Sequence, residues 1–326
     1  MEIAVYSCRP DEIQAMDKFE KEYGVSLRRT EEPLNEKTVS MARGCQAISI
    51  ITTQVTAPLL DVLHTAGIAY ISTRTIGYDH IDVSYAKKLG MHVGNVSYSP
   101  NSVADYAVML ILMSTRRMKS IWRHALVQNY SLDGVQGREL PNLTVGVVGT
   151  GHIGRAVIRR LVGFGCRILA TDLYENDEVK KAAQYVPLDT LLHESDVITL
   201  HMPATKNDYH IMNQKNLAKM KKDAVLVNTG RGSLIDSDAL IDALEAGSIG
   251  GAALDVIENE AGLYYNDLQD QPLKNRDLAL LKSFPNVIVT PHTAFYTDQA
   301  VSDMVENSIK SCIAYAKGEK NPWQVV

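Results

Sequence analysis

Three glycines at a fixed spacing, between a short apolar stretch and a helical one, constrain this chain more than any other feature. Residues 145–148 read as a buried strand, Gly149, Gly151 and Gly154 follow as G-x-G-x-x-G, and residues 155–165 have a helical pattern. In such a turn the first glycine permits the tight bend, the second lets backbone approach a pyrophosphate, and the third allows close helix–strand packing. The helix N-terminus then offers unpaired N–H groups to phosphates. The pattern therefore predicts a dinucleotide-binding unit.

An acidic residue at the end of the next strand indicates which dinucleotide is bound. Residues 167–171 form a second apolar stretch followed by Asp172, near the acidic position expected about 20 residues on. Its carboxylate would bond the ribose hydroxyls and repel a 2′-phosphate, so we predict NAD rather than NADP. We expect His152 and Ile153, inside the glycine turn, to contact the cofactor too. A tight turn with no ligand is the alternative.

Composition excludes several other classes of protein. The chain of 326 residues is long enough for two domains. Its net charge of −5 argues against nucleic-acid or membrane-surface partners. The acidic N-terminus does not resemble a signal peptide, and the apolar run 107–113 is far shorter than the roughly 20 residues that span a bilayer. The four cysteines include no C-x-x-C pair, so we expect reduced thiols in the cytoplasm and no metal site.

Short apolar strands alternate with helical stretches along the chain, which predicts an α/β fold with parallel sheets. We expect a smaller flavodoxin-like substrate (catalytic) domain over 1–100 and 297–326, and a Rossmann NAD-binding domain over 101–296. The amphipathic segment 298–317 follows the last strand and is expected to return to the first domain. The strands expected are 3–6, 47–51, 70–72 and 92–95 in the first domain, and 145–148, 168–171, 197–200, 225–228, 252–256 and 287–290 in the second.

The segment from Val103 to Arg117 is apolar on nearly every side of its predicted helix. A helix of this kind must be buried, either in a large core or between subunits. We expect a subunit interface here, and hence a homodimer.

Ligands of doubly wound sheets bind outside the carboxyl ends of the strands, so the residues that follow each strand are the candidates for chemistry. Clustered charged side chains at one sheet edge indicate a functional site. The residues at these ends are His201, Pro203, Thr229, Arg231, Asp255, Glu258, Glu260 and His292.

This set suits hydride transfer between a nicotinamide and a 2-oxo or 2-hydroxy acid. A guanidinium such as Arg231 binds a carboxylate in a fixed orientation, histidine exchanges a proton in the right pH range, and a neighbouring carboxylate orients the ring. Among nine histidines, only His201 and His292 follow buried strands. We favour His292, because the preceding proline restrains its backbone, and His201 remains the alternative.

Motifs in a fixed order resemble those of the D-isomer-specific 2-hydroxyacid dehydrogenases over nearly the whole length. They are VGVVGTGHIGR at 145–155, VNTGRGSLID at 227–236, GGAALDV at 250–256 and TPHTA at 290–294. The resemblance implies that Arg231 binds substrate, that Glu260 partners the histidine, with Glu258 as a competitor, and that His292 is the proton donor.

The same resemblance implies further cofactor contacts. Asp255 would lie beside the nicotinamide carboxamide, and His201 to Pro203 would line the cofactor cleft through backbone contacts. We expect Thr229, at the neighbouring strand end, to contact the cofactor as well.

Within the family the chain is most similar to D-lactate dehydrogenases of the fermentative and vancomycin-resistance types, on residues 70–82, 93–113 and 260–272. The resemblance implies reduction of pyruvate to D-lactate, and a pocket whose members are Ile76, Gly77, Tyr98, Arg231, Phe295 and Tyr296. Thr52 and Thr53 stand where the lactobacillar enzymes usually carry an aromatic residue, which leaves substrate size open. The alternatives are a larger 2-oxo acid (2-oxoisocaproate, phenylpyruvate or 2-oxoglutarate) and, more remotely, a non-enzymatic NAD-sensing corepressor.

Overall fold

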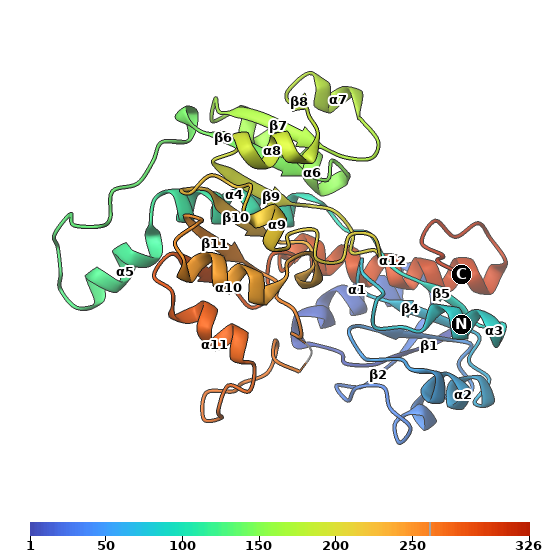
Figure 1. Cartoon of the computed structure of the whole chain (residues 1–326). Helices are drawn as coiled ribbons and strands as arrows, with labels where there is room; N and C mark the ends of the chain where they lie inside the picture. The colour runs from blue at the N-terminus through green and yellow to red at the C-terminus, as the bar shows by residue number, and fades with distance from the viewer. Residues whose placement is uncertain (261) are drawn as a thin grey trace. The chain divides into compact units, whose positions relative to one another are not determined.

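The computed structural model describes residues 1–260 and 262–326, and the chain divides into two compact units. The first comprises residues 1–99 and 296–326, and the second comprises residues 100–295 (Figure 1). Among the described residues, no helix is both long enough and apolar enough to cross a membrane. Each unit is built on its own parallel sheet.

The described residues of the first unit form a five-stranded parallel sheet in the order β2-β1-β3-β4-β5, with helices on both faces. This is a flavodoxin-like order, as the sequence predicts. On one face α1 and α12 cover the sheet, and α2 and α3 cover the other. The elements are β1 (Glu2–Val5), η1 (Pro10–Glu12), α1 (Ile13–Tyr23), β2 (Ser26–Arg29), η2 (Val39–Ala42), β3 (Ala47–Ile50), α2 (Ala57–Thr65), β4 (Tyr70–Thr73), α3 (Val83–Lys88), β5 (His92–Gly94) and α12 (Asp298–Lys317).

The expected helix over 298–317 is confirmed with the same bounds, as α12. The hydroxyl of Thr297 accepts a hydrogen bond from the N–H of Ala300 at its start, and Gly318 ends it in the left-handed conformation with φ 65°. Strand β2 is absent from the sequence prediction, because its residues SLRR are mostly polar. Such a composition suits the sheet edge that β2 occupies.

The described residues of the second unit form a seven-stranded parallel sheet in the order β12-β11-β10-β9-β6-β7-β8. The order reverses between β6 and β9, which is the switch point where doubly wound sheets bind their ligands. The sequence prediction misses β8, which has only two residues. The strands are β6 (Thr144–Val148), β7 (Arg167–Thr171), β8 (Gln184–Tyr185), β9 (Val197–Leu200), β10 (Val225–Asn228), β11 (Gly251–Leu254) and β12 (Val287–Val289).

Helices cover both faces of this sheet and bury nearly all of the central strands β9, β10 and β11. One core lies between the sheet and α4 and α6, and the other lies beneath α8, α10 and α11. The helices are α4 (Asn101–Thr115), α5 (Met118–Leu126), η3 (Leu140–Asn142), α6 (His152–Val162), α7 (Asp177–Lys180), α8 (Leu188–Glu194), α9 (Gln214–Leu217), η4 (Gly232–Leu234), α10 (Ser237–Glu245) and α11 (Arg276–Ser283).

Helix α4 contains most of the apolar segment for which we expected a subunit interface, and the structure buries much of it inside the second unit itself. Ala104, Ala107, Leu110 and Ile111 are completely buried in the core shared with α6 and the sheet. Burial in a core, the alternative reading, therefore accounts for these apolar residues. Exposed apolar side chains occur instead in the next segment, residues 118–135, which we call the arm.

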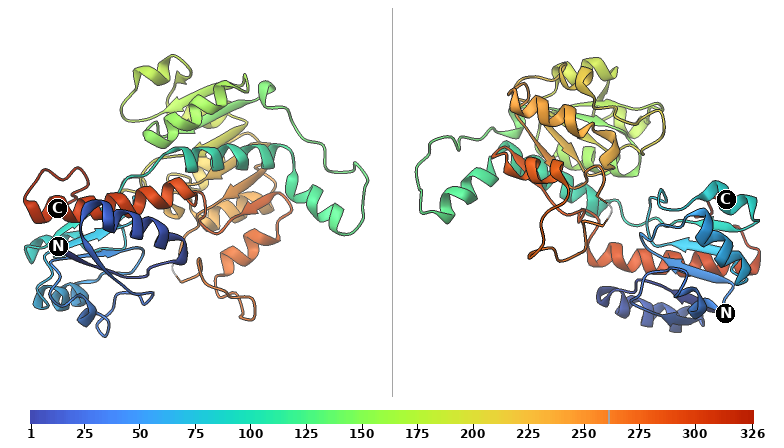
Figure 2. Two further views of the ribbon diagram at one scale, coloured as in Figure 1. Left: turned by 180° about the vertical axis from the view of Figure 1, so that it is seen from behind. Right: turned by 60° about the horizontal axis from the view of Figure 1, so that its bottom comes forward.

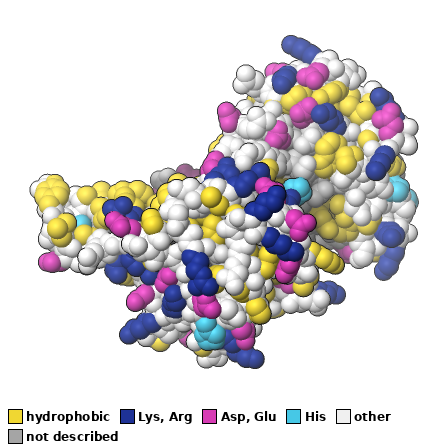
Figure 3. Space-filling model, turned by 90° about the horizontal axis from the view of Figure 1, so that it is seen from above, with side chains coloured by type: hydrophobic (Ala, Val, Ile, Leu, Met, Phe, Trp, Pro, Cys, Tyr) yellow, Lys and Arg dark blue, Asp and Glu magenta, His cyan; other side chains and the backbone are white. Residues whose placement is uncertain are grey.

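Figures 1 and 2 show the arm extending away from the seven-stranded sheet of its own unit. It consists of α5 and the irregular chain after it, and none of its described residues is buried. Hydrophobic side chains gather over this end of the unit (Figure 3). The most exposed of them are Leu126 at 84% and Leu132 at 85%.

Candidate active site and cofactor site

The glycine turn has the geometry that its spacing predicts. Gly149 follows β6 with φ +91°, and a Cβ there would lie 2.7 Å from the backbone of His201. A Cβ on Gly154 would lie 1.9 Å from the carbonyl oxygen of Gly149. Gly151 caps the N-terminus of α6, and apart from its two chain neighbours no described residue lies within 4 Å of the position of a Cβ on it. The turn therefore requires glycines at 149 and 154 and leaves open space before the helix N-terminus, which His152 and Ile153 begin.

Asp172 follows β7 and is hydrogen-bonded to the glycine turn. One carboxylate oxygen accepts the N–H of Thr150 at 2.5 Å and its hydroxyl at 3.0 Å. The other oxygen accepts the N–H of Tyr174 at 3.2 Å. Partial burial disfavours ionisation, but these hydrogen bonds outweigh it and lower the pKa of Asp172. Thr150 is thus a functional candidate that the glycine pattern, which reads only positions 149, 151 and 154, cannot identify.

His201 follows β9, and its side chain is half-buried, with Nδ1 enclosed by the protein. Burial lowers the pKa of its imidazole to about 3, so the ring is neutral at physiological pH. Its Nε2 lies 2.9 Å from the hydroxyl of Thr199. Its backbone, with Pro203 two residues on, borders the glycine turn. A neutral imidazole is a poor proton donor, so His201 is the weaker of the two histidine candidates.

The pattern of unpaired groups beside this turn fits a dinucleotide. Within the described residues, the hydroxyl of Thr229 and Nδ1 of His201 are buried without a hydrogen-bond partner. Buried polar groups usually have partners, so two such groups near a glycine turn and an open helix N-terminus suit a polar ligand. The residues present fit NAD.

Asp255 follows β11 and holds the loop that carries His292. Its completely buried carboxylate accepts hydrogen bonds from the hydroxyl of Thr290 at 2.6 Å and from the N–H groups of Thr293 at 3.0 Å and Ala294 at 2.8 Å. Its carbonyl oxygen accepts the N–H of His292 at 2.8 Å. The sequence predicts a contact between Asp255 and the cofactor, and the structure adds this structural task.

His292 and Glu260 form a close pair. Nδ1 of His292 lies 2.6 Å from a carboxylate oxygen of Glu260, and both side chains are nearly a third exposed. The backbone of His292 is left-handed with φ +52°, a conformation that is uncommon for residues other than glycine and often occurs at functional sites. The pair directs the second ring nitrogen, Nε2, away from Glu260. A histidine held in this way can exchange a proton with a substrate.

Tyr265 is a neighbour of His292 that sequence reasoning did not single out. Its hydroxyl donates to the carbonyl oxygen of His292 at 2.8 Å, and its ring centroid lies 6.3 Å from that of the imidazole. The ring of Phe295, predicted as a pocket residue, meets the imidazole edge-on at 6.3 Å. A tyrosine in a long loop carries no pattern that would identify it.

Arg231 follows β10 and immediately precedes η4. The amide of Asn228 donates to the carbonyl oxygen of Arg231 at 2.8 Å, and a Cβ on Gly232 would lie 2.0 Å from the carbonyl oxygen of Ile257. These contacts fix the backbone on both sides of the guanidinium. Because β10, β11 and β12 are adjacent parallel strands, the segments bearing Arg231, Glu260 and His292 emerge at the same sheet edge.

The remaining predicted pocket residues belong to the first unit. Ile76 and Gly77 lie in the loop after β4, where the amide of Asn95 donates to the carbonyl oxygen of Ile76 at 2.8 Å. Tyr98 follows β5, and the ring of Tyr296 lies beneath the guanidinium of Arg9 at 5.7 Å.

Comparison with known proteins identifies the same chemistry. Residues 108–294 match the family model described as "D-isomer specific 2-hydroxyacid dehydrogenase, NAD binding domain". The chain is 45% identical over 320 residues to a D-specific alpha-keto acid dehydrogenase of Enterococcus faecium, covering 98% of each chain. It is 42% identical over 309 residues to an aromatic 2-oxoacid reductase of Clostridium sporogenes, covering 94% of this chain and 93% of that protein.

A solved structure resembles the whole chain. The D-lactate dehydrogenase of Treponema pallidum superposes with a TM-score of 0.91 at 36% identity, and the match covers 100% of both chains. The chain belongs to the D-isomer-specific 2-hydroxyacid dehydrogenases, and is an NAD-dependent oxidoreductase of the D-2-hydroxy acid type.

Proposed function

We propose that this enzyme reduces pyruvate to D-lactate, with Arg231, Glu260 and His292 as its catalytic residues. The observation that carries the proposal is the 2.6 Å contact between His292 and Glu260, on the sheet edge from which Arg231 also emerges. When bound, NADH supplies a hydride to the substrate C2, and NAD⁺ accepts it in the reverse direction.

The roles of the three side chains follow from their chemistry. Arg231 binds the substrate carboxylate, because a guanidinium presents two parallel donors to it. His292 gives a proton from Nε2 to the carbonyl oxygen during reduction and takes it back during oxidation. Glu260 accepts a hydrogen bond from Nδ1, which fixes the orientation of the ring.

The backbone N–H groups of Ile76 and Gly77 are proposed to bind the substrate carboxylate as well. This proposal is supported by hydrogen bonds that fix the loop within the first unit. The amide of Asn95 donates to the carbonyl oxygen of Ile76, and the hydroxyl of Thr75 donates to that of Gly77. We propose Tyr98, Phe295 and Tyr296 as residues around the substrate side chain. For the cofactor, the proposed contacts are Gly149, Gly151, His152, Ile153, Gly154, Asp172, His201, Pro203, Thr229 and Asp255.

A larger 2-oxo acid is the second candidate substrate. Thr52 and Thr53 are small residues in the loop after β3, and a relative of 42% identity is named an aromatic 2-oxoacid reductase. Pyruvate remains the first choice because of the overall likeness to a D-lactate dehydrogenase.

One assay separates these candidates. Initial rates of NADH oxidation are measured with pyruvate, 2-oxoisocaproate, phenylpyruvate and 2-oxoglutarate, and the product's configuration is determined by chiral chromatography. We expect the highest kcat/KM with pyruvate and a D product. A higher kcat/KM with phenylpyruvate selects the larger substrate, and no NADH oxidation with any of the acids contradicts the enzyme assignment.

We propose a homodimer, with the arm rather than α4 as the surface that meets the second copy. Trp122, Leu126, Val127, Tyr130 and Leu132 are all more than half exposed, and an apolar patch of this kind is characteristic of an interface between subunits. A cytoplasmic location is proposed as well, since the four cysteines are free thiols, which suits a reducing compartment.

A further inference from the structure

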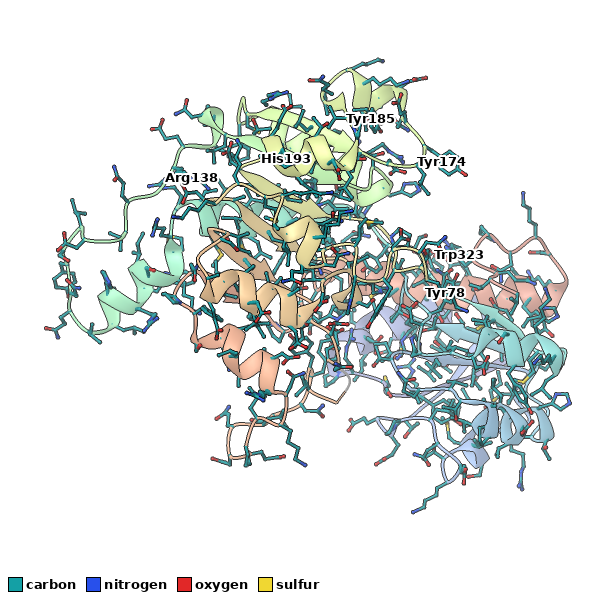
Figure 4. All side chains as sticks on the ribbon, in the orientation of Figure 1. Tyr78, Arg138, Tyr174, Tyr185, His193 and Trp323 are labelled. Carbon is teal, nitrogen blue, oxygen red and sulfur yellow. The ribbon has the colours of Figure 1, made fainter. Side chains whose placement is uncertain are left out.

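A series of hydroxyl groups ends on Asp172. Thr150, which is only 2% exposed, places its N–H and its hydroxyl against one carboxylate oxygen, at 2.5 and 3.0 Å. The phenol oxygen of Tyr185, in β8, lies 2.8 Å from the hydroxyl oxygen of Thr150. The N–H of Asn176 donates to that phenol oxygen at 3.0 Å. Figure 4 labels Tyr185 at this edge of the seven-stranded sheet.

The number of hydrogens fixes the direction of every bond in this series. An ionised carboxylate only accepts, so the hydroxyl of Thr150 gives its single hydrogen to Asp172. The oxygen of Thr150 can then only accept, and the phenol of Tyr185 must donate to it. Asn176 donates to Tyr185 in turn, so all the donors point toward Asp172. Hydrogen bonds aligned in this way polarise and strengthen one another.

The series restrains a side chain that would otherwise rotate. Asp172 is exposed to solvent, and exposed side chains usually exchange among several rotamers. Its inner oxygen, Oδ2, is held by Thr150, and its outer oxygen, Oδ1, accepts the N–H of Tyr174 at 3.2 Å. Because a carboxylate oxygen has two lone pairs, the outer oxygen keeps one for a hydroxyl of the ribose.

We propose that Tyr185 and Thr150 are positioning residues for cofactor selection, which fix Asp172 in the orientation that accepts NAD and rejects NADP. The inference rests on the proposed contact of Asp172 with the ribose. A carboxylate that cannot rotate away repels a 2′-phosphate, whereas a mobile carboxylate can turn aside and admit it. Selection thus depends on two uncharged residues as well as on the acid itself.

The test uses Tyr185→Phe, which removes the phenol hydroxyl and keeps the ring, and Thr150→Val, which replaces the hydroxyl by a methyl group. The dissociation constants of NADH and NADPH are measured by nucleotide fluorescence, and kcat and KM are measured with both nucleotides. The preference for NADH over NADPH should fall about three- to ten-fold in each variant, as for the loss of one hydrogen bond. The kcat with NADH should change less than its KM, and Thr150→Ser should restore much of the preference lost in Thr150→Val.

A matched control is Tyr23→Phe, which removes a phenol–carboxylate hydrogen bond of 2.6 Å to Glu306 in the first unit. Tyr23→Phe should leave the nucleotide preference unchanged. A fall in preference in this variant as well would mean that a general loss of stability causes the effect. Asp172→Ser separates the two levels of the argument. If it leaves the preference unchanged, the proposed ribose contact fails, and the inference with it. If Asp172→Ser lowers the preference for NADH, but Tyr185→Phe and Thr150→Val leave that preference unchanged, only the positioning role is overturned.

Discussion

The Nε2 atom of His210 lies 2.7 Å from a carboxylate oxygen of Glu258. The other oxygen of Glu258 accepts the N–H of Ser237 at 3.2 Å, at the start of α10. Two residues further on, Glu260 contacts His292 instead. The sequence left both acids as candidate partners of the catalytic histidine, but each contacts a different histidine. Glu258 contacts His210 and the start of α10, whereas Glu260 contacts His292 at the candidate active site.

Because the two glutamates contact different histidines, the same substitution should affect catalysis at one of them and stability at the other. Glu260→Gln should lower kcat at least ten-fold while the free energy of unfolding changes little, because the carboxylate orients His292. Glu258→Gln should lower the free energy of unfolding by about 1 kcal/mol or more, as expected for a hydrogen bond to a charged group, and should keep kcat near the wild type. Initial rates and urea unfolding measure both quantities, and the reverse assignment of the two phenotypes would refute the proposed roles.

Arg231→Lys should lower kcat/KM for pyruvate about ten- to hundred-fold, because an ammonium group cannot donate two parallel hydrogen bonds to a carboxylate. The dissociation constant of NADH, measured by fluorescence, should remain unchanged. Arg138→Lys is the matched control, since its guanidinium donates to the carbonyl oxygen of Asp223, apart from the candidate site (Figure 4). Undiminished kcat/KM in Arg231→Lys would exclude the carboxylate-binding role.

His292→Gln should reduce kcat about 10²- to 10⁴-fold, the usual contribution of a positioned acid–base group. NADH binding should persist, because the glycine turn and Asp172 are untouched. Stopped-flow measurement of hydride transfer shows whether the chemical step itself is slowed. A variant that turns over at the wild-type rate would shift the proton-donor role to another residue.

Titration of His201 should make stability depend on pH. The pKa of its buried imidazole is about 3 in the folded state, below the value near 6.5 of an unfolded histidine. As the pH falls, the unfolded chain therefore binds a proton at His201 before the folded chain does. The stabilisation from a neutral His201 is complete above about pH 6.5 and is lost as the pH falls toward 3. The loss approaches about 1.4 kcal/mol per pH unit.

Urea unfolding of the wild type and His201→Gln between pH 7 and pH 4 measures this contribution. The variant lacks the titrating group, so its free energy of unfolding should decrease less steeply as the pH falls. Equal slopes for the two proteins would show that His201 is already protonated, or accessible, in the folded state.

Replacing Leu126 and Leu132 together by Asp should convert the dimer to a monomer, because it places two charges in the proposed apolar interface. Light scattering coupled to gel filtration gives the mass directly. Ile13→Asp, at an apolar side chain in the first unit that is 44% exposed, should leave the mass unchanged. A dimeric double variant, or a monomeric wild type, would remove the arm from the interface.

Elements with strong local patterns were predictable. The glycine turn, the buried strands after it and α12 each follow from periodicity, capping residues and glycine spacing within a short window. Strand β2 was missed because edge strands tolerate polar residues, and β8 because two residues carry no period. The subunit interface expected at α4 stays a prediction, since an apolar surface does not reveal whether its partner is the same chain or a second one.

Local sequence patterns specified the cofactor class, the alternation of strands and helices, and the short set of residues after each strand. Tertiary structure alone decided which acid meets which histidine, that His201 is neutral, and that Thr150 and Tyr185 join Asp172. The physical reason is the range of the interactions. Backbone propensity and glycine spacing act over a few residues, whereas the pairs His292–Glu260 and Tyr185–Thr150 join positions 32 and 35 residues apart. Burial and hydrogen bonding assign their roles only after the sheet has brought them together.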